Sequence, residues 1–190
     1  MARMPMPGTW SRDGFGFQTS ACPWTIETWS FLCRWPTYPT SMHPMKFLSL
    51  SSRLTTRSMP DQICITGDFI TTGLPATRIY RSILEKLSNT AATFAVMGNH
   101  DGGSWEHPRG GLHSTREVGA LLLDSGIEVL NTRSTSWTGE VHRATWVGLG
   151  DLWAKESEPV FAFGGVTETP DPVIVLSHNP DSKETLRNYS

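Results

Sequence analysis

Short apolar runs alternate with amphipathic stretches from Asp61 onward. Five runs have the length and the β-branched or aromatic content of buried strands, at residues 62–66, 93–97, 127–130, 145–149 and 173–176. The last of them, "VIVL", is the most apolar. Amphipathic segments separate these runs, and strands that alternate with helices predict an α/β layered fold.

Two segments have the spacing of amphipathic helices. Residues 76–87 place four apolar side chains on one helical face: Ile79, Ile83, Leu84 and Leu87. A second helix is expected to open with a capping box of Ser114 and Glu117 and to stop at Gly126. Its predicted inward side chains are Val118, Leu121 and Leu122. Asn179 and Pro180 suit the N-cap and first position of a third helix.

Residues 1–60 follow no such pattern. They contain no valine, whereas the remaining 130 residues contain nine, and their four tryptophans stand at neither strand nor helix spacing. Charge is also divided, with +4 in residues 1–60 and −6 in the rest. We expect an irregular segment over 1–60, with one short element near Lys46 to Leu50. The alternative is an ordinary N-terminal subdomain.

The bulk composition excludes several classes. A chain of 190 residues suits one domain, and a net charge of −2 gives no general attraction to nucleic acid or an anionic membrane. Three cysteines form neither a disulfide framework nor a zinc knuckle, which favours a reducing compartment. No apolar run approaches the roughly 18 residues of a membrane span, and no secretory signal follows Arg3. A cytoplasmic location is therefore expected.

Polar side chains follow three of the predicted strands. Asp68 follows the first, Asn99, His100 and Asp101 follow the second, and His178 follows the last. Sites in α/β sheets form outside the carboxyl ends of the strands, so these side chains are expected to converge. A carboxylate, an amide oxygen and an imidazole suit Mn, Fe or Zn. The glycines that precede Asp68 and Asn99 have no side chain, so they allow the backbone and a substrate to approach each other closely.

These motifs resemble those of a known family. "TGDFI" (66–70), "GNHD" (98–101) and "LSHNPD" (176–181) are similar to motifs of the calcineurin-like metallophosphoesterases. "GLGDLW" (148–153) is similar to the bacterial branch with lipid-linked phosphoesterases and UDP-diacylglucosamine pyrophosphatase-like enzymes. The resemblance covers about residues 61–190. It implies a layered αββα sandwich, two divalent metal ions, and a phosphorylated small-molecule or lipid-linked substrate.

The resemblance also implies a reaction and a role for each residue. A metal-bound hydroxide would hydrolyse a phosphate ester or anhydride. Asp68 would bridge the two metals, and Asn99 and His178 would bind the second. His100 would face the phosphate as a catalytic group without binding metal, and Asp101 would orient His100 from behind.

The chain departs from the family pattern at both ends. The opening D-x-H motif and the closing G-H-x-H motif are absent, so the first metal keeps Asp68 alone and the second keeps Asp68, Asn99 and His178. We therefore expect a fold that is incomplete at both ends, with the family domain over 61–190 truncated at its C-terminus. The alternative function is an impaired relative that binds a metal or phosphate without turnover. Open apolar edges predict self-association.

One hypothesis explains the N-terminal difference. Read in another frame, the codons of "WPTY" in "RWPTYP" (34–39) permit the tripeptide Ala-Asp-Leu. In the family that the chain resembles, this tripeptide often begins the D-x-H motif. Residues up to about Met59 would then be a frame-shifted reading, and the genomic sequence tests this.

Structural roles are the alternatives for several polar residues. His178 fits a buried histidine bonded to the backbone, and Asp151 fits a turn or helix-cap residue. Three further residues, in a glycine-rich loop, are expected to be solvated: Glu106, His107 and His113.

Overall fold

The computed structural model describes residues 52–53, 57, 60–71, 73–74, 77–139, 143–166 and 170–189. The element predicted near Lys46 to Leu50 and most of the atypical segment 1–60 lie outside the described residues.

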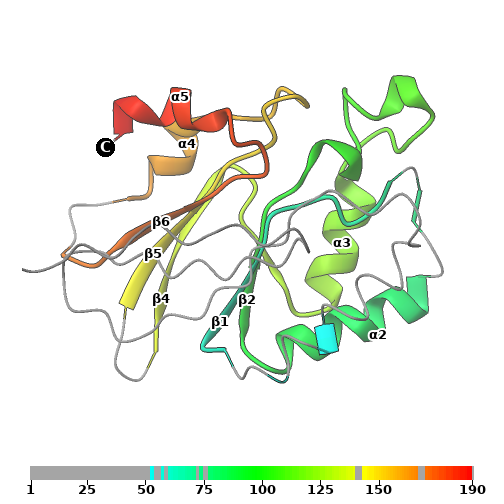
Figure 1. Ribbon diagram of the computed structural model, residues 1–190, viewed down its shortest axis with the longest axis horizontal. Coiled ribbons are helices and arrows are strands. Elements are labelled where there is room, and N and C mark those ends of the chain that lie inside the picture. The colour runs from blue at the N-terminus through cyan, green and yellow to red at the C-terminus, as the bar shows by residue number, and fades with distance from the viewer. Residues whose placement is uncertain are drawn as a thin grey trace, which may run out of the picture.

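Six strands and four α-helices follow one another along the described chain (Figure 1). The strands are β1 (Gln62–Ile65), β2 (Ala92–Ala95), β3 (Glu128–Val129), β4 (Arg133–Thr138), β5 (Arg143–Gly148) and β6 (Val173–Leu176). The α-helices are α2 (Thr77–Ser88), α3 (Arg116–Asp124), α4 (Pro159–Phe163) and α5 (Ser182–Leu186). Three 3-10 turns complete the set: η1 (Asn99–Asp101), η2 (His107–Arg109) and η3 (Arg187–Tyr189).

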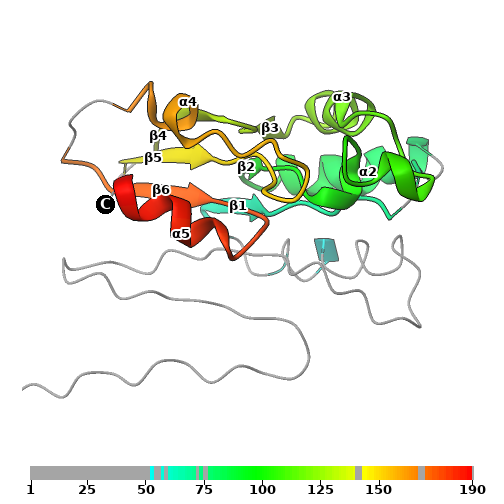
Figure 2. The same cartoon turned by 90° about the horizontal axis from the view of Figure 1, so that it is seen from above.

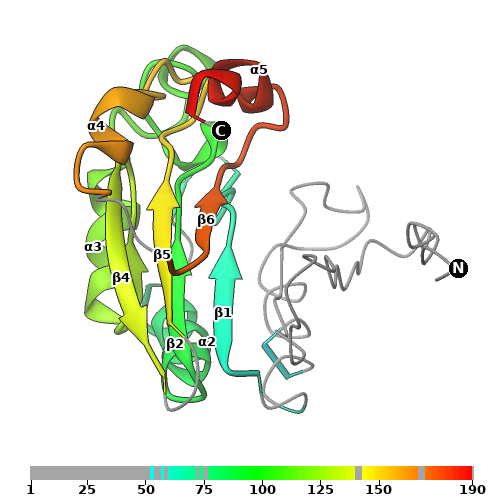
Figure 3. The ribbon, with the colours of Figure 1, turned by 90° about the vertical axis from the view of Figure 1, so that its left-hand side faces the viewer.

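The strands form two three-stranded sheets. In the first, with order β1-β2-β3, all neighbours are parallel. In the second, with order β4-β5-β6, β4 and β5 are antiparallel whereas β5 and β6 are parallel. The arrowheads of β1, β5 and β6 point the same way (Figure 3), so their carboxyl ends lie toward one end of the molecule.

Side chains that alternate between the two faces of the strands form three apolar cores. Phe94 of β2 stacks on Trp146 of β5, with ring centroids 5.3 Å apart, in the core between the sheets. The neighbouring Ala95 belongs to the core beneath α2 and α3, and Val147 packs with α4 on the other side of the second sheet. Because successive strand residues face opposite sides, the result is the predicted αββα layering (Figure 2).

Most predicted elements are confirmed with bounds shifted by a few residues. In α2 the buried set includes Tyr80 rather than Ile79, which is 58% exposed. The Tyr80 hydroxyl donates to the Phe69 carbonyl, so the aromatic residue anchors the segment that follows Asp68. The predicted capping box is wrong, because Thr115 is the N-cap of α3 and makes no side-chain cap bond. For α5, the N-cap is Asp181 rather than Asn179.

Strand β4 was not predicted from the pattern. Its sequence, "RSTSWT", contains one large apolar residue, and its side chains are exposed or half-buried. It pairs with β5 over six residues, so backbone bonding to a buried neighbour sets its structure. Among the described residues, no helix has both the length and the apolar character that crossing a bilayer requires.

Candidate metal centre and active site

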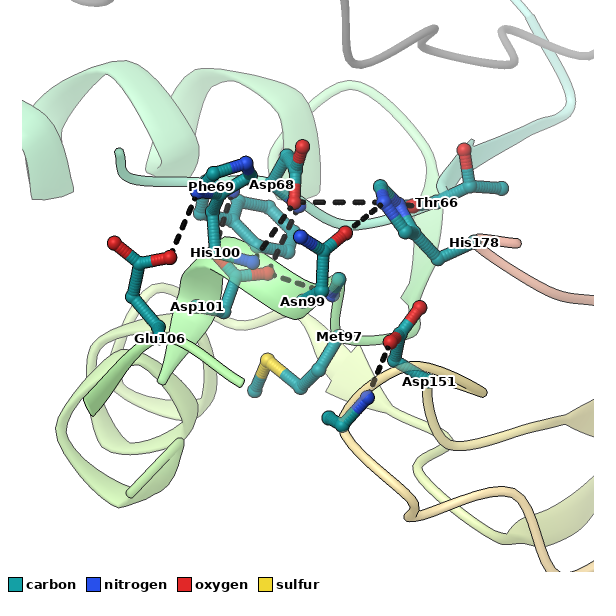
Figure 4. Close-up of polar contacts among 12 residues, drawn as sticks. Thr66, Asp68, Phe69, Met97, Asn99, His100, Asp101, Glu106, Asp151 and His178 are labelled. Atoms are coloured by element: carbon teal, nitrogen blue, oxygen red, sulfur yellow. Dashed lines mark hydrogen bonds and ion pairs between the residues drawn. The ribbon is translucent and has the colours of Figure 1, made fainter. Parts of the chain in front are cut away.

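Three polar side chains meet beyond the carboxyl ends of β1, β2 and β6 (Figure 4). The His178 Nε2 atom lies 3.1 Å from Asn99 Oδ1 and 3.5 Å from Asp68 Oδ1. Asp68 and Asn99 are 3% exposed, and the His178 side chain is 6% exposed. The structure therefore brings together the predicted carboxylate, amide and imidazole, although His178 follows a strand of the other sheet.

Close backbone approach makes this convergence feasible. A Cβ atom on Gly98 would overlap Asp68 Oδ1 and would lie 2.8 Å from His178 Cε1. Any side chain at position 98 would consequently displace two of the converging groups. Gly67 has a φ of +92°, and a Cβ there would overlap the Gly98 nitrogen. Both glycines are thus required by space, as expected from the sequence.

Asp68 adopts a left-handed backbone conformation, with a φ of +57°. Asp and Asn enter this region more readily than other residues with a side chain. The turn directs Asp68 Oδ1 toward the Asn99–His178 side, where it also accepts a bond of 3.2 Å from the His100 backbone N–H. The unusual conformation of Asp68 therefore coincides with the point where the site converges.

The other ring nitrogen of His178 is bound by the backbone. His178 Nδ1 lies 2.5 Å from the Thr66 carbonyl oxygen, which can only accept, so Nδ1 carries a proton. In the neutral ring, Nε2 then presents a lone pair to the oxygens of Asn99 and Asp68. Three acceptor atoms that face one another in this way would be satisfied by a cation held between them. The backbone bond predicted as the alternative role of His178 is thus present, and it also orients Nε2 toward Asn99 and Asp68.

These donors fit one divalent cation. Asp68 Oδ1, Asn99 Oδ1 and His178 Nε2 are hard to borderline donors that suit Mn, Fe or Zn, and three protein ligands can hold a metal. Within the described ranges, no group of three or more His, Cys, Asp or Glu residues could hold a metal ion, so this donor set depends on the Asn99 amide. The second ion that the resemblance implies therefore has no complete ligand set among the described residues.

Asp101 lies beneath the converging groups and holds the backbone. Its Oδ2 accepts the N–H groups of Asp68 and Gly98 at 2.9 and 2.8 Å. Its Oδ1 accepts those of Phe69 and Ile70 at 2.6 and 3.2 Å. The prediction that Asp101 orients the His100 ring is therefore wrong, because both of its oxygens bind the two turns that follow β1 and β2.

The environment of Asp101 opposes its charge. Burial, and then the nearby charge of Asp68, raise the pKa of Asp101 to about 7, while bonds from the Gly98, Ile70 and Phe69 amides lower it. Two carboxylates thus share one buried site, and the backbone amides of both turns offset part of the resulting cost.

His100 lies at the rim, beside a carboxylate that was expected to be solvated. His100 Nδ1 is 2.9 Å from Glu106 Oε2, and their side chains are 42% and 2% exposed. Glu106, not Asp101, is consequently the carboxylate beside the ring, and the expectation of a solvated Glu106 is wrong. No local sequence signal identifies Glu106, since its contact depends on how the loop after η1 folds back. His107 and His113 are exposed, as expected, with their rings stacked 3.6 Å apart.

Asp151 has the turn role that was predicted for it. Its Oδ1 accepts the Ala154 N–H at 2.8 Å, and the residue is fully buried. The turn follows β5 and lies on the same side of the sheets as His178 (Figure 4).

Comparison with known proteins agrees with the motifs. The model of the calcineurin-like phosphoesterase family matches residues 46–189, so the match begins inside the segment predicted to be atypical. A crystal structure of TT1561 from Thermus thermophilus is 17% identical in sequence and superposes with a TM-score of 0.49. The aligned part is 76% of this chain and 72% of the TT1561 chain.

Two curated relatives show sequence similarity over a comparable length. Phosphodiesterase YaeI of Escherichia coli K12 is 33% identical over 146 residues, which are 76% of this chain and 50% of that protein. UDP-2,3-diacylglucosamine pyrophosphatase LpxG of Chlamydia muridarum is 25% identical over 186 residues, covering 77% and 55%. The chain thus spans about half the length of these relatives. On the family match and the site motifs together, this chain belongs to the calcineurin-like phosphoesterase family.

Proposed function

We propose that this site hydrolyses a phosphate ester or anhydride with a divalent cation held by Asp68, Asn99 and His178. The observation that carries the proposal is the convergence of two oxygen atoms, Asn99 Oδ1 and Asp68 Oδ1, on His178 Nε2, while the other ring nitrogen is bound by the backbone. A cation bound there would activate water and neutralise charge on the phosphate oxygens. Mn, Fe and Zn all suit the donors.

The chain's own groups complete the proposed chemistry. Asp101 holds both turns in place through backbone N–H groups, and Glu106 Oε2 lies 2.9 Å from Nδ1 of His100. Because the His100 ring is half-exposed, its Nε2 can meet a phosphate oxygen from the solvent side. In that position the ring would donate a hydrogen bond to the developing charge or a proton to the leaving oxygen.

The relatives' names suggest the bond that is cleaved. One is named a phosphodiesterase and the other a pyrophosphatase of a diacylated nucleotide sugar, so each name implies a phosphorus joined through oxygen to two further groups, both organic in a diester, and one organic and one phosphoryl in a diphosphate. We extend this to a phosphodiester or diphosphate substrate, either a small molecule or a lipid-linked one.

Metal analysis and turnover test the proposal together. Purified protein is expected to bind Mn²⁺ and to hydrolyse bis-p-nitrophenyl phosphate, and Asn99→Ala is expected to lose both because it removes a ligand oxygen. Asn89→Ala, at an exposed position after α2, is the matched control and should behave as the wild type. Wild-type protein with neither Mn²⁺ binding nor turnover would refute the proposal.

A second candidate is supported by the incomplete ligand set. Among the described residues no group of three or more His, Cys, Asp or Glu side chains could hold a metal, and the three converging donors include the Asn99 amide, so the chain fits a relative that binds at most one cation without turnover. Mn²⁺ binding that Asn99→Ala abolishes, without hydrolysis by the wild type, would establish this candidate instead.

Glu106→Gln provides a test of the His100 pair. The amide keeps the size of the side chain and removes the charge that fixes the ring, so kcat should fall roughly 10- to 100-fold with little change in KM. Steady-state kinetics measure this, with Glu117→Gln on the exposed face of α3 as the matched control. If kcat were unchanged in Glu106→Gln, the close pair would have no part in turnover.

A further inference from the structure

One oxygen of the Asp151 carboxylate has no hydrogen-bond partner. Asp151 is 0% exposed, and while its Oδ1 accepts the Ala154 N–H, its Oδ2 accepts nothing. A buried carboxylate oxygen without a donor is costly, and native proteins usually satisfy such groups with water or an ion. The turn role therefore explains Oδ1 of Asp151 but leaves the buried Oδ2 unexplained.

The position of Asp151 connects it to the candidate metal centre. Gly148 pairs with Leu176 in the parallel register of β5 and β6, and the Leu149 N–H donates to the Leu176 carbonyl. The chain after β5 accordingly runs beside the chain that carries His178. In Figure 4 the unpaired oxygen points toward the side of Asn99 and His178, away from the turn that its partner oxygen caps.

The charges around Asp151 leave it without a counter-ion. A titratable neighbour on the same turn is another acid, Glu156, whose pKa is raised by burial and further by Asp151, and lowered by a bond from Asn131. In the part of the chain that the structure describes, no lysine, arginine or histidine forms an ion pair with Asp151. A buried carboxylate whose free oxygen faces the side of Asn99 and His178 is an arrangement that a hydrated cation would satisfy.

We propose that Asp151 is an outer acceptor of the metal centre. Its Oδ2 accepts a hydrogen bond from water held beside the bound cation, and its charge strengthens cation binding. Direct ligation is not implied, because Asp68, His178 and Asp151 do not form a metal-binding group of three. The inference rests on the proposed function, since it requires a cation at Asp68, Asn99 and His178.

Asp151→Asn separates this role from the turn. The amide keeps an oxygen to accept the Ala154 N–H, but removes the charge and replaces the free acceptor with a donor. By titration calorimetry with Mn²⁺, we expect Kd to rise about 10- to 100-fold. The melting temperature of the metal-free protein should be unchanged or higher. Asp181→Asn makes the same change at an exposed position three residues after His178, and its Kd should remain that of the wild type.

The outcomes distinguish the inference from the proposed function. A wild-type protein that does not bind Mn²⁺ overturns the metal site and the role of Asp151 together. Wild-type binding with an equal Kd in Asp151→Asn, or an equal weakening in Asp181→Asn, overturns the role of Asp151 alone. A structure of the wild type with Mn²⁺ needs no variant. There Oδ2 should contact a water beside the ion, and an Oδ2 without that water refutes the inference.

Discussion

Asp101→Asn is expected to lower the free energy of unfolding by roughly 2–4 kcal/mol, although it changes only one atom and removes one charge. The carboxylate accepts four backbone N–H groups from the turns after β1 and β2. An amide has one oxygen for these donors and turns its NH2 group toward the others. At least one buried N–H would lose its partner, at a fully buried position where water cannot replace it.

Urea unfolding followed by circular dichroism measures this effect. Asp124→Asn is the control, because that side chain is 68% exposed and its pair with Arg81, at 3.6 Å, contributes little. Asp101→Ala, which removes every acceptor, should be more destabilising still and bring a domain of ordinary stability close to unfolding. Equal stability of Asp101→Asn and the wild type would show that the four bonds do not hold the turns.

The residues of the candidate site could be predicted from the sequence because the strand pattern and the sheet topology lead to the same edge. Buried strands followed directly by Asp68, Asn99 and His178 bring these groups together, because parallel strands carry their carboxyl ends to one edge. That reasoning needs only the strand pattern and the direction of pairing. The structure places His178 beside Asn99 and Asp68 although β6 belongs to the second sheet, since the two sheets pack against each other.

The pattern could not reveal contacts that long-range folding decides. Asp101 follows His100 in sequence, yet its carboxylate binds amides more than 30 residues away. Glu106 lies in a polar loop with no periodicity, and its burial beside His100 appears only once the loop has folded. Strand β4 is similar, because its polar side chains carry no strand signal and its pairing with β5 defines it. Local sequence thus specifies which residues reach the site, and tertiary packing assigns their roles.

Asp68→Asn is expected to leave the protein folded but to abolish metal binding and turnover, in contrast to Asp101→Asn, which lowers stability. Asn accepts the left-handed φ of +57° as readily as Asp, and its oxygen can still take the His100 N–H. The substitution also removes the charge that raises the pKa of Asp101, so the melting temperature should be equal or higher. What is lost is the carboxylate that faces His178 Nε2 at 3.5 Å.

The predicted loss of activity is large because a cation depends on that charge. Several kcal/mol of charge stabilisation at the transition state correspond to about a thousandfold in rate, so kcat/KM for bis-p-nitrophenyl phosphate should fall by about that factor. Mn²⁺ binding by calorimetry should weaken in parallel. The identical chemical change at positions 68 and 101 then separates two roles within one site: Asp101→Asn should lose stability first, and Asp68→Asn should lose metal and turnover. An Asp68→Asn protein that keeps both would place the cation elsewhere, because the charge that faces the His178 ring would then contribute nothing to holding it.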